Sequence, residues 1–383
     1  MSLEIEQVQS KKELRQFISV PWKVYENDSN WVPWLFFERL EFFDKRKNPL
    51  FEHAEVDYFI ARRGGQPVGT IAAILNHRHN EFQQENVAHF GVFELLDDPE
   101  AGLALLETAA DWARTRGAER ILGPVTLSTN DEVGMLIEGF DRPPALLMPY
   151  NPPYYMEMME HAGFTKAMDL LAWIANLDEI VNHMPPKVER IVGKVGERYG
   201  LKIRPINIDD WDAEIDRIKT VYNAAWERNW GFVPMTDSEI EHLAEGLKLL
   251  LDPALIFIVE RDGEPIGFSL TMPDVNQPLL RIRPGPSLLS SYLAAGRLFL
   301  NRYKTDTVRV LALGVIEQYR GRGVDALMYY ETAQAAARRG YDWAEASWIL
   351  ETNEMMNRAI ELMKGRIYKR YRIWEQELAS DSN

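Results

Sequence analysis

The 383-residue chain contains no cysteine, which excludes disulfide staples, thiolate metal sites and thiol nucleophiles. It also lacks any uncharged apolar run of about 18 residues, the length that a bilayer-spanning helix needs. Residues 1–9 alternate apolar and polar side chains, unlike the basic and then apolar order of a secretion signal. We therefore expect a cytoplasmic protein without a transmembrane segment.

Positive charge is the scarcer sign in this chain. Lysine and arginine number 43 against 58 aspartates and glutamates, which gives a net charge of −15. Such a chain is repelled by nucleic acid and by anionic membranes, except at a local basic patch. We expect no nucleic-acid partner.

The composition is that of a globular protein, with 46% hydrophobic and 26% charged residues. The length predicts two domains, with three as the alternative. His77 and His79 lie close together without a third ligand in view, so the sequence predicts no metal site.

An internal repeat links the two halves of the chain. Residues 59–69 and 257–267 share Phe, Ile, Arg, Gly, Pro and Gly at one offset, 257 − 59 = 198, and each segment predicts a β-hairpin. Further matches lie upstream and downstream in the same order. We interpret them as a duplication; the alternative is that any αβ protein contains hairpins ending in glycine.

The second half alternates strands and helices, which predicts an α/β class with mixed sheets. The expected elements are a strand at 201–206, helices at 211–229 and from 236, a hairpin at 255–272, a strand at 308–315, a helix at 323–339, a strand at 342–349, a helix at 353–363 and a strand at 366–374. The first half repeats this order from 3 to 173. We expect repeats at 1–176 and 201–383, joined by a linker at 177–200.

A glycine-containing loop opens the helix predicted at 323–339. Gly321 and Gly323 allow the backbone to approach a ligand, and amides at a helix N-terminus form a cradle for pyrophosphate. The loop is not a P-loop, because the Gly-Lys-Ser/Thr ending is missing. It is not a Rossmann fingerprint either, because the third glycine is absent.

This strand, loop and helix resemble the signature of the GNAT superfamily of acyl-CoA-dependent N-acyltransferases. The signature is a strand ending in valine, here Val315, followed by Arg/Gln-x-x-Gly-x-Gly/Ala at the start of a helix. The resemblance covers essentially the whole chain, as two GNAT-like repeats, and is strongest to bacterial tandem-GNAT proteins. It implies a tandem GNAT fold with two pseudo-symmetric halves and acyl-CoA, acetyl or longer, as donor. The implied donor-binding residues are Leu313, Val315, Arg320, Gly321, Arg322, Gly323, Val324, Asp325 and Asn353.

Two departures from the GNAT pattern affect the site. Asp325 replaces the last Gly/Ala of the signature, although a register starting at Gln318 also fits the pattern. Ile360 occupies the place where the family often has a tyrosine that protonates the leaving thiolate.

The first half has lost the loop. Residues 94–102 contain four acids and a proline in place of Arg-Gly-Arg-Gly, so no polyanion should bind there. The resemblance then implies one acyl-CoA per chain, held by the second half. The degenerate first half would supply a scaffold and one wall of the acceptor site.

Glu351 is the candidate general base, since it follows the strand at 342–349 where the GNAT sheet splays. Its alternative role is to favour the start of the next helix, and Glu317 is a second possible base. Turn-rich, aromatic loops in the first half predict an acceptor site for a primary, moderately apolar or lipid-like amine. Its residues would be Asn130, Asp131, Tyr154 and Tyr155. The apolar insert at 276–304 would cover an acyl chain or amine, or form core packing or a dimer surface.

The resulting hypothesis is an N-acyltransferase that works by direct attack of the amine on the thioester, as a monomer or homodimer. A non-catalytic, CoA-sensing tandem-GNAT protein is the alternative, favoured by Asp325 and the missing acid. A transferase that uses aminoacyl-tRNA fits less well with the charge of −15.

Overall fold

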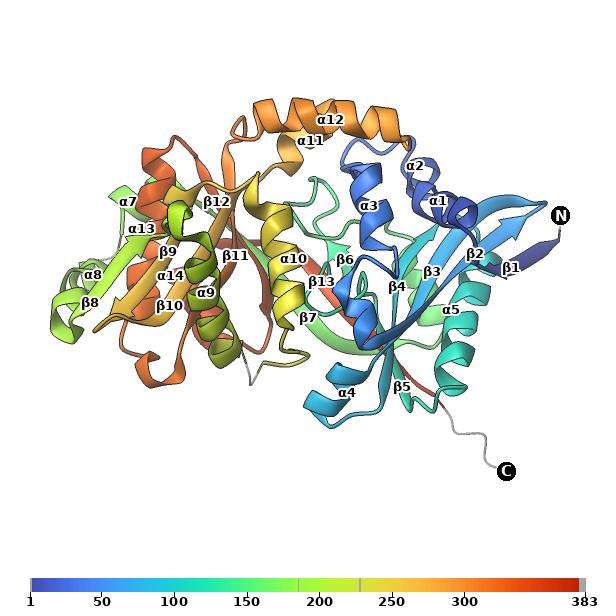
Figure 1. Cartoon of the computed structure of the whole chain (residues 1–383), viewed down its shortest axis with the longest axis horizontal. Helices are drawn as coiled ribbons and strands as arrows, with labels where there is room; N and C mark the ends of the chain where they lie inside the picture. Colours follow the sequence, from blue (N-terminus) through green and yellow to red (C-terminus); the bar gives the residue numbers. More distant parts are fainter. Residues whose placement is uncertain (1, 185, 227–228, 379–383) are drawn as a thin grey trace. The chain divides into compact units, whose positions relative to one another are not determined.

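The computed structural model describes residues 2–184, 186–226 and 229–378. They form two compact units, each with strands covered by helices (Figure 1). The first unit combines the described residues of 1–170, 279–298 and 370–383, and the second combines those of 171–278 and 299–369. Both units therefore draw on segments that are distant in sequence, and the mixed α/β class is confirmed.

The elements of the first unit are β1 (Leu3–Gln7), α1 (Lys11–Ser19), α2 (Pro21–Val24), α3 (Phe36–Phe42), η1 (Pro49–Glu52), β2 (Ala54–Arg63), β3 (Gln66–Asn76), α4 (His77–Gln83), β4 (Val87–Leu95), α5 (Pro99–Arg114), β5 (Arg120–Gly123), β6 (Met135–Glu138) and α6 (Tyr155–His161). Four elements have residues in both units: β7 (Thr165–Asn176), α11 (Asn276–Ile282), α12 (Leu288–Asn301) and β13 (Arg366–Glu377).

The elements of the second unit are α7 (Leu177–Asn182), α8 (Pro186–Tyr199), β8 (Leu201–Pro205), η2 (Ile208–Asp210), α9 (Trp211–Trp226), α10 (Asp237–Lys248), η3 (Pro253–Leu255), β9 (Ile256–Arg261), β10 (Glu264–Pro273), β11 (Thr307–Val315), η4 (Glu317–Tyr319), α13 (Val324–Arg338), β12 (Trp343–Leu350) and α14 (Glu354–Leu362). The region expected as a linker thus contains α7 and α8.

Each unit has a mixed sheet in which one parallel pair interrupts antiparallel pairing. In the first unit the order is β1-β2-β3-β4-β5-β13, with β4 and β5 parallel and β6 also paired to β13. In the second unit the order is β12-β11-β10-β9-β8, with β11 and β12 parallel. The parallel pair involves the same strands of the duplicated order in both units.

The duplicated hairpins share their fine geometry. Both residues of each turn have positive φ, 57° and 78° at Gly64 and Gly65, and 53° and 89° at Asp262 and Gly263. Each hairpin also changes register at the same place after its turn, between Pro67 and Gly69 and between Pro265 and Gly267. A shared turn and a shared bulge confirm the repeat that the sequence predicted for these segments.

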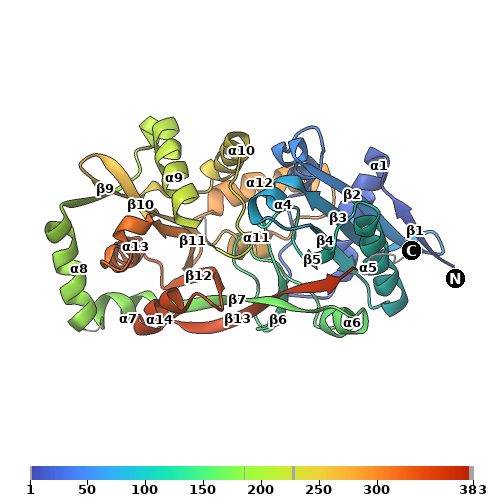
Figure 2. The ribbon, with the colours of Figure 1, turned by 90° about the horizontal axis from the view of Figure 1, so that it is seen from below.

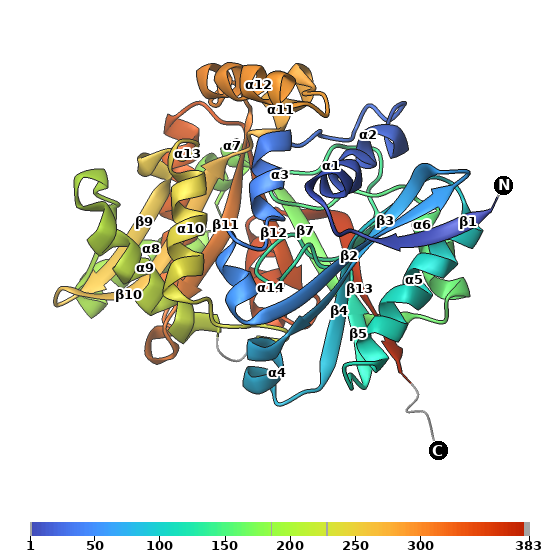
Figure 3. The same ribbon diagram turned by 45° about the vertical axis from the view of Figure 1, so that its right-hand side comes forward.

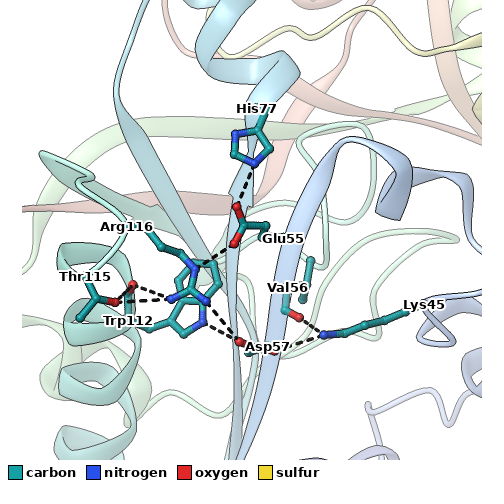
Figure 4. Close-up of polar contacts among 8 residues, drawn as sticks. All are labelled: Lys45, Glu55, Val56, Asp57, His77, Trp112, Thr115 and Arg116. Carbon is teal, nitrogen blue, oxygen red and sulfur yellow. Dashed lines mark hydrogen bonds and ion pairs between the residues drawn. The ribbon is translucent and has the colours of Figure 1, made fainter.

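Helix α5 is fastened to strand β2 by a polar network (Figure 4). Trp112 Nε1 donates to Asp57 Oδ2 at 2.8 Å, and the Arg116 guanidinium lies 3.8 Å from the centre of the Trp112 ring. Burial raises the pKa of Asp57, but the bond from Trp112 and the Lys45 ammonium outweigh it, so this pKa lies below its usual range. The carboxylate is therefore held ionised while it anchors the helix.

Helices α9 and α13 cover opposite faces of the second unit's strands (Figure 2). Val315 packs with Val324 and Met328 of α13 in one apolar cluster. The preceding residue of β11, Gly314, faces α9, where an added Cβ would lie 2.4 Å from the Trp226 ring. Glycine at this position lets the indole lie directly on the strand.

The predicted elements around the loop are confirmed to within one residue at each end for β11, α13, β12 and α14. The capping box predicted at Thr236 and Glu239 is present at the start of α10. Strand β13 runs three residues further than expected, because Trp374–Glu377 pair with β5. Alternation of apolar and polar residues is judged over a few neighbouring residues, so it cannot indicate pairing with a strand as distant in sequence as β5.

Candidate functional site

Strands β11 and β12 separate halfway along their length. Their parallel pairing covers 307–310 with 343–346, whereas the strands continue to Val315 and Leu350. Strand β10 stays paired to β11 as far as Val315. The carboxyl-terminal halves of β11 and β12 therefore make no ladder hydrogen bonds to each other.

The N-terminus of α13 follows directly from this separated part of β11. Its N-cap residue, Gly323, has φ of 85° and supplies no side-chain cap to the first-turn amides. Gly321 also lies in the left-handed region, with φ of 68°, so both glycines are needed by the backbone. Uncapped amides at a helix N-terminus suit an anion such as a pyrophosphate.

Arginine side chains shape this loop. Arg320 donates from Nε to the Val315 carbonyl at 3.1 Å and from Nη2 to the Ala225 carbonyl at 2.6 Å. The exposed Arg322 lies over the Tyr319 ring, with Cζ 5.5 Å from its centre. Arg320 thus fixes the loop to the body of the unit, whereas Arg322 offers an exposed cation beside the uncapped helix. Asp325 sits in the first turn of α13, half-buried.

The corresponding helix of the first unit, α5, has its N-terminus closed. Asp98 caps it by accepting a hydrogen bond from the Ala101 amide at 3.2 Å. Arg63 pairs with the same carboxylate at 2.6 Å and with Glu100 at 2.8 Å. A first-turn amide that an anion would need is therefore bonded to a carboxylate of the chain. The absence of a donor site in this repeat stays a prediction.

An apolar pocket lies beside the parallel part of β11 and β12, within the second unit. Its empty volume is about 540 Å³, part of which is open to solvent. It is lined by side chains of β7, α7, β11, α13, β12 and α14: Trp173, Ala175, Leu177, Ile180, Val308, Val310, Leu313, Tyr329, Thr332, Ala333, Ala336, Ala344, Ala346, Ile360 and Met363. Five alanines leave room that larger side chains would fill. Ile360, at the place where the family often has a tyrosine, is part of this apolar wall.

A buried cluster of charges occupies the alternate positions of the same strands. Val308 and Val310 line the pocket, so Arg309 between them projects from the other face of β11. Glu345 holds the same place between Ala344 and Ala346. The Arg309 Nε and Glu345 Oε2 atoms are 3.5 Å apart, with side-chain exposures of 4% and 1%.

Further polar groups surround this pair. Arg309 Nη2 donates to the Ser347 carbonyl at 3.0 Å, and Tyr368 Oη donates to Glu345 Oε1 at 3.2 Å. Burial raises the pKa of Glu345 above its usual value, against the opposing effects of Arg309, Tyr368 and Lys369. The cluster therefore holds a carboxyl group that binds its proton more tightly than an ordinary glutamate does.

Sequence reasoning missed Arg309 and Glu345, although a signal was present. A strand buried on both faces is expected to be continuously apolar. Each of two neighbouring strands instead has one charged residue between two small apolar ones, Val-Arg-Val and Ala-Glu-Ala. Opposite charges at such positions of two adjacent strands indicate a buried ion pair.

The predicted residues after β12 lie near one another. Glu351 is half-buried at the end of the strand, and its carbonyl accepts a hydrogen bond from Asn357 Nδ2 at 3.4 Å. Asn353 caps α14 by accepting from the Met356 amide at 3.2 Å. The Asn353 side chain thus serves as the cap of this helix. The base role of Glu351 and the donor-binding role of Asn353 stay predictions.

The predicted acceptor residues are in the first unit. Tyr154 Oη donates to the Leu95 carbonyl at 2.6 Å, and the buried Tyr155 Oη accepts from the Leu95 amide at 2.5 Å. These phenols tie α6 to the end of β4. Asn130 and Asp131 are half-buried in the loop before β6. Their binding of an amine stays a prediction.

Glu94 is buried beside these tyrosines. Tyr25 Oη donates to Glu94 Oε2 at 2.7 Å. Burial is the main reason that the pKa of Glu94 rises from 4.5 to about 8, with Glu132 adding to the effect. One of the four acids that replace the loop in the first half is therefore a core residue rather than a surface charge.

No group of three or more His, Asp or Glu suited to a metal ion occurs in the parts of the chain that the structure describes. Across residues 2–184, 186–226 and 229–378, none of the helices has both the length and the apolar character needed to cross a bilayer.

The fold is that of tandem GNAT proteins. A tandem GNAT protein from the clavulanic acid biosynthesis pathway superposes with a TM-score of 0.57 at 12% identity, covering 99% of both chains. A GCN5-related N-acetyltransferase from Sphaerobacter thermophilus gives a TM-score of 0.52 at 12% identity, covering 98% of this chain and 96% of that one. No protein-family model matches the sequence.

Two curated proteins match the sequence along nearly its full length. The bacterial ceramide synthase of Caulobacter vibrioides is 35% identical over 382 residues, 98% of each chain. Protein YghO of Escherichia coli is 34% identical over 373 residues, 96% of this chain and 94% of its own. The chain belongs to the family that includes these two proteins.

Proposed function

We propose that the chain transfers a long acyl group from acyl-CoA to the amino group of a long-chain, lipid-like amine. The single observation that carries this proposal is the apolar pocket beside β11 and β12. Strand β11 leads to the uncapped N-terminus of α13, and both β11 and α13 line the pocket, so the elements that would hold the donor's pyrophosphate also border space for a hydrocarbon chain.

The donor would bind along the second unit. The pyrophosphate would meet the first-turn amides of α13, with Arg322 as a nearby cation. Beyond residue 310, β12 no longer pairs with β11. A backbone amide on this unpaired edge, between Leu311 and Val315, would polarise the thioester carbonyl. The acyl chain would then enter the apolar pocket.

The reaction would follow the chemistry of an amine and a thioester. The amine nitrogen loses a proton, attacks the carbonyl carbon and forms the C–N bond of an amide, while the C–S bond breaks and CoA leaves as a thiolate that takes up a proton. Holding amine and thioester in one site supplies much of the rate. Two carboxyl groups are candidates for the proton acceptor, Glu345 in the buried cluster and Glu351 after β12.

The acceptor class is supported by the family. A relative that shares 35% identity over 98% of the chain is called a ceramide synthase, and a ceramide is the N-acyl amide of a long-chain amino alcohol. An acceptor of that class matches the primary, moderately apolar amine expected from the sequence. CoA would be the second product.

The test is a CoA-release assay with the full chain. Acyl-CoA donors from acetyl to palmitoyl would each be combined with a short primary amine, an amino acid and a sphingoid-type amino alcohol. We expect turnover to be highest with the long donor and the long-chain amine, and mass spectrometry to detect the amide.

Two outcomes would contradict the proposal. Tight acyl-CoA binding without CoA release for any amine would favour the ligand-sensing alternative. Equal turnover with acetyl-CoA and palmitoyl-CoA would remove the assigned role of the pocket.

A further inference from the structure

Helix α12 exposes apolar side chains on its outer face. Leu289, Leu293 and Leu300 are 72%, 58% and 78% exposed, and Tyr292 is 60% exposed. Spacings of three, four and seven residues place these four side chains on one side of the helix. An outward-facing stripe of this kind is the reverse of the usual pattern, in which the apolar face of a surface helix is covered.

The opposite face of α12 is already covered by the first unit. Ser291 is buried and its hydroxyl accepts a hydrogen bond from the Phe37 amide at 3.3 Å. At the edge of the exposed stripe, the Tyr292 ring stacks on the Phe37 ring with their centres 4.7 Å apart. Figures 1 and 3 show α12 lying next to α3, which carries Phe37. The helix is thus held in place with its leucines outward.

The connection before α12 is anchored as well. Trp22 Nε1 donates to the Pro284 carbonyl at 2.8 Å, and Arg283 Nη2 donates to the Asp28 carbonyl at 3.1 Å. These bonds join a segment of the second repeat to the first unit. A rigidly mounted apolar face loses little conformational entropy when it is covered.

The charge of this region departs from that of the chain. Residues 276–304 contain no aspartate or glutamate, although the whole chain carries a net charge of −15. The segment has five basic residues: Arg281, Arg283, Arg297, Arg302 and Lys304. A basic segment with leucines and tyrosines is the composition of a helix that lies in a bilayer interface.

We propose that α12 docks on an anionic lipid surface. The leucine stripe enters the boundary between headgroups and acyl chains, and the basic side chains of the segment meet the anionic headgroups. The rest of the acidic protein is repelled by the same surface, so binding is confined to this helix. The inference rests on α12 and the basic residues of 276–304 and does not depend on the proposed reaction.

A second copy of the chain is a poorer occupant of this face. A twofold contact through α12 would place each basic segment against its equivalent. With no acid within 276–304, such a contact would bring like charges together without a partner carboxylate from the same segment. Anionic headgroups provide the negative charge that residues 276–304 do not contain.

The experiment is vesicle flotation of the full chain. Phosphatidylcholine vesicles with added phosphatidylglycerol would be compared with vesicles of phosphatidylcholine alone, at low and high salt. Leu289→Ser with Leu293→Ser removes the centre of the stripe. Leu243→Ser with Leu249→Ser, which changes two exposed leucines at α10, is the matched control. Thermal melting checks that all variants fold.

We expect binding to the anionic vesicles only, weakened by salt. The α12 variant should bind roughly tenfold or more weakly, since two leucines no longer enter the lipid, while the α10 variant binds like the wild type. Arg297→Gln with Lys304→Gln should reduce the preference for phosphatidylglycerol.

The proposal is overturned if the wild-type protein floats with neither kind of vesicle. It is also overturned if the α12 variant floats with the anionic vesicles as well as the wild type does. It is also overturned if light scattering shows a dimer that the α12 variant abolishes while no vesicle binds, because a second copy then covers this face.

Discussion

Arg309 and Glu345 face each other at 3.5 Å across the parallel strands β11 and β12, and both side chains are almost completely buried. An ion pair in this position contributes little to stability, because the desolvation of two charges offsets their attraction. It does place a carboxyl group with a raised pKa next to the point where the strands separate. This is why Glu345 competes with Glu351 as the proton acceptor.

The first prediction separates these two carboxyl groups. If Glu345 accepts the proton, Glu345→Gln lowers kcat roughly 100-fold or more, whereas Glu351→Gln changes it little. The catalytic form is the ionised one, so activity should rise with pH through a pKa above that of an ordinary glutamate. Steady-state rates across pH with acyl-CoA and amine measure both effects.

A control keeps the first prediction free of folding effects. Losing one partner of a buried pair costs about 3–5 kcal/mol, so melting curves must accompany the kinetics. A stable Glu345→Gln protein with an unchanged kcat and pH profile would assign the pair a structural role.

The second prediction concerns the donor loop. Gly323→Glu should abolish acyl-CoA binding, since a carboxylate would stand at the uncapped N-terminus of α13. Gly323→Gln imposes the same backbone strain at a φ of 85° without the charge, so it is the matched control. Calorimetry should give one donor site per wild-type chain and weaker, measurable binding for the glutamine variant. Equal loss in both variants would point to strain rather than charge.

The third prediction concerns the length of the acyl chain. Ala333 lines the pocket and is nearly completely buried, so Ala333→Phe should fill part of the space. The kcat/KM for palmitoyl-CoA should fall roughly tenfold or more relative to that for acetyl-CoA. Arg338→Phe, at an exposed position near the end of the same helix, is the control. A uniform loss for all donors would indicate general damage to the fold.

The fourth prediction uses the pKa of Glu94, which burial raises from 4.5 to about 8. The folded state binds this proton more tightly, so the free energy of unfolding should fall as pH rises from about 4.5 to 8, at up to roughly 1.4 kcal/mol per pH unit. In Glu94→Gln this contribution to the slope is absent. Denaturant titrations across pH test it, with the exposed Glu157→Gln as the control; parallel curves for wild type and Glu94→Gln would refute it.

The fifth prediction concerns the independence of the first repeat. A fragment of residues 1–176 lacks α12 and the part of β13 that pairs with β5 and β6. We expect it to be insoluble or to melt without a cooperative transition in circular dichroism. A soluble fragment with a sharp transition would show that the first repeat folds without these segments.

Local sequence features account for much of this fold. Hairpin turns, the glycine loop and the capping box each act within a few residues, and the structure confirms them where the sequence placed them. Because the sequence indicates a duplication, the elements predicted for the second half could also be assigned to the first. Element boundaries near Val315 and Asn353 were accurate because each is set by a local signal, a turn or a cap.

The parts that could not be predicted depend on distant segments. The local pattern of β13 does not indicate that Trp374 pairs with Gly123. The sequences around Phe37 and Tyr292 likewise do not indicate that their rings stack. The position of Glu94 in the core also depends on Tyr25, which is 69 residues away. The buried pair Arg309 and Glu345 was readable in principle, but only by asking which charges interrupt apolar strands.

The pairing of β13 with β5 has a consequence for biosynthesis. Trp374 meets Gly123, so 374 − 123 = 251 residues must be translated before that ladder closes. At roughly 5–20 residues per second, the edge of β5 waits on the order of 10–50 s on the ribosome without its final partner. An unpaired strand edge is a template for intermolecular pairing, so nascent chains are most exposed to aggregation in this interval. A message truncated near its 3′ end would release a polypeptide in which the first unit, although made first, is left unfinished.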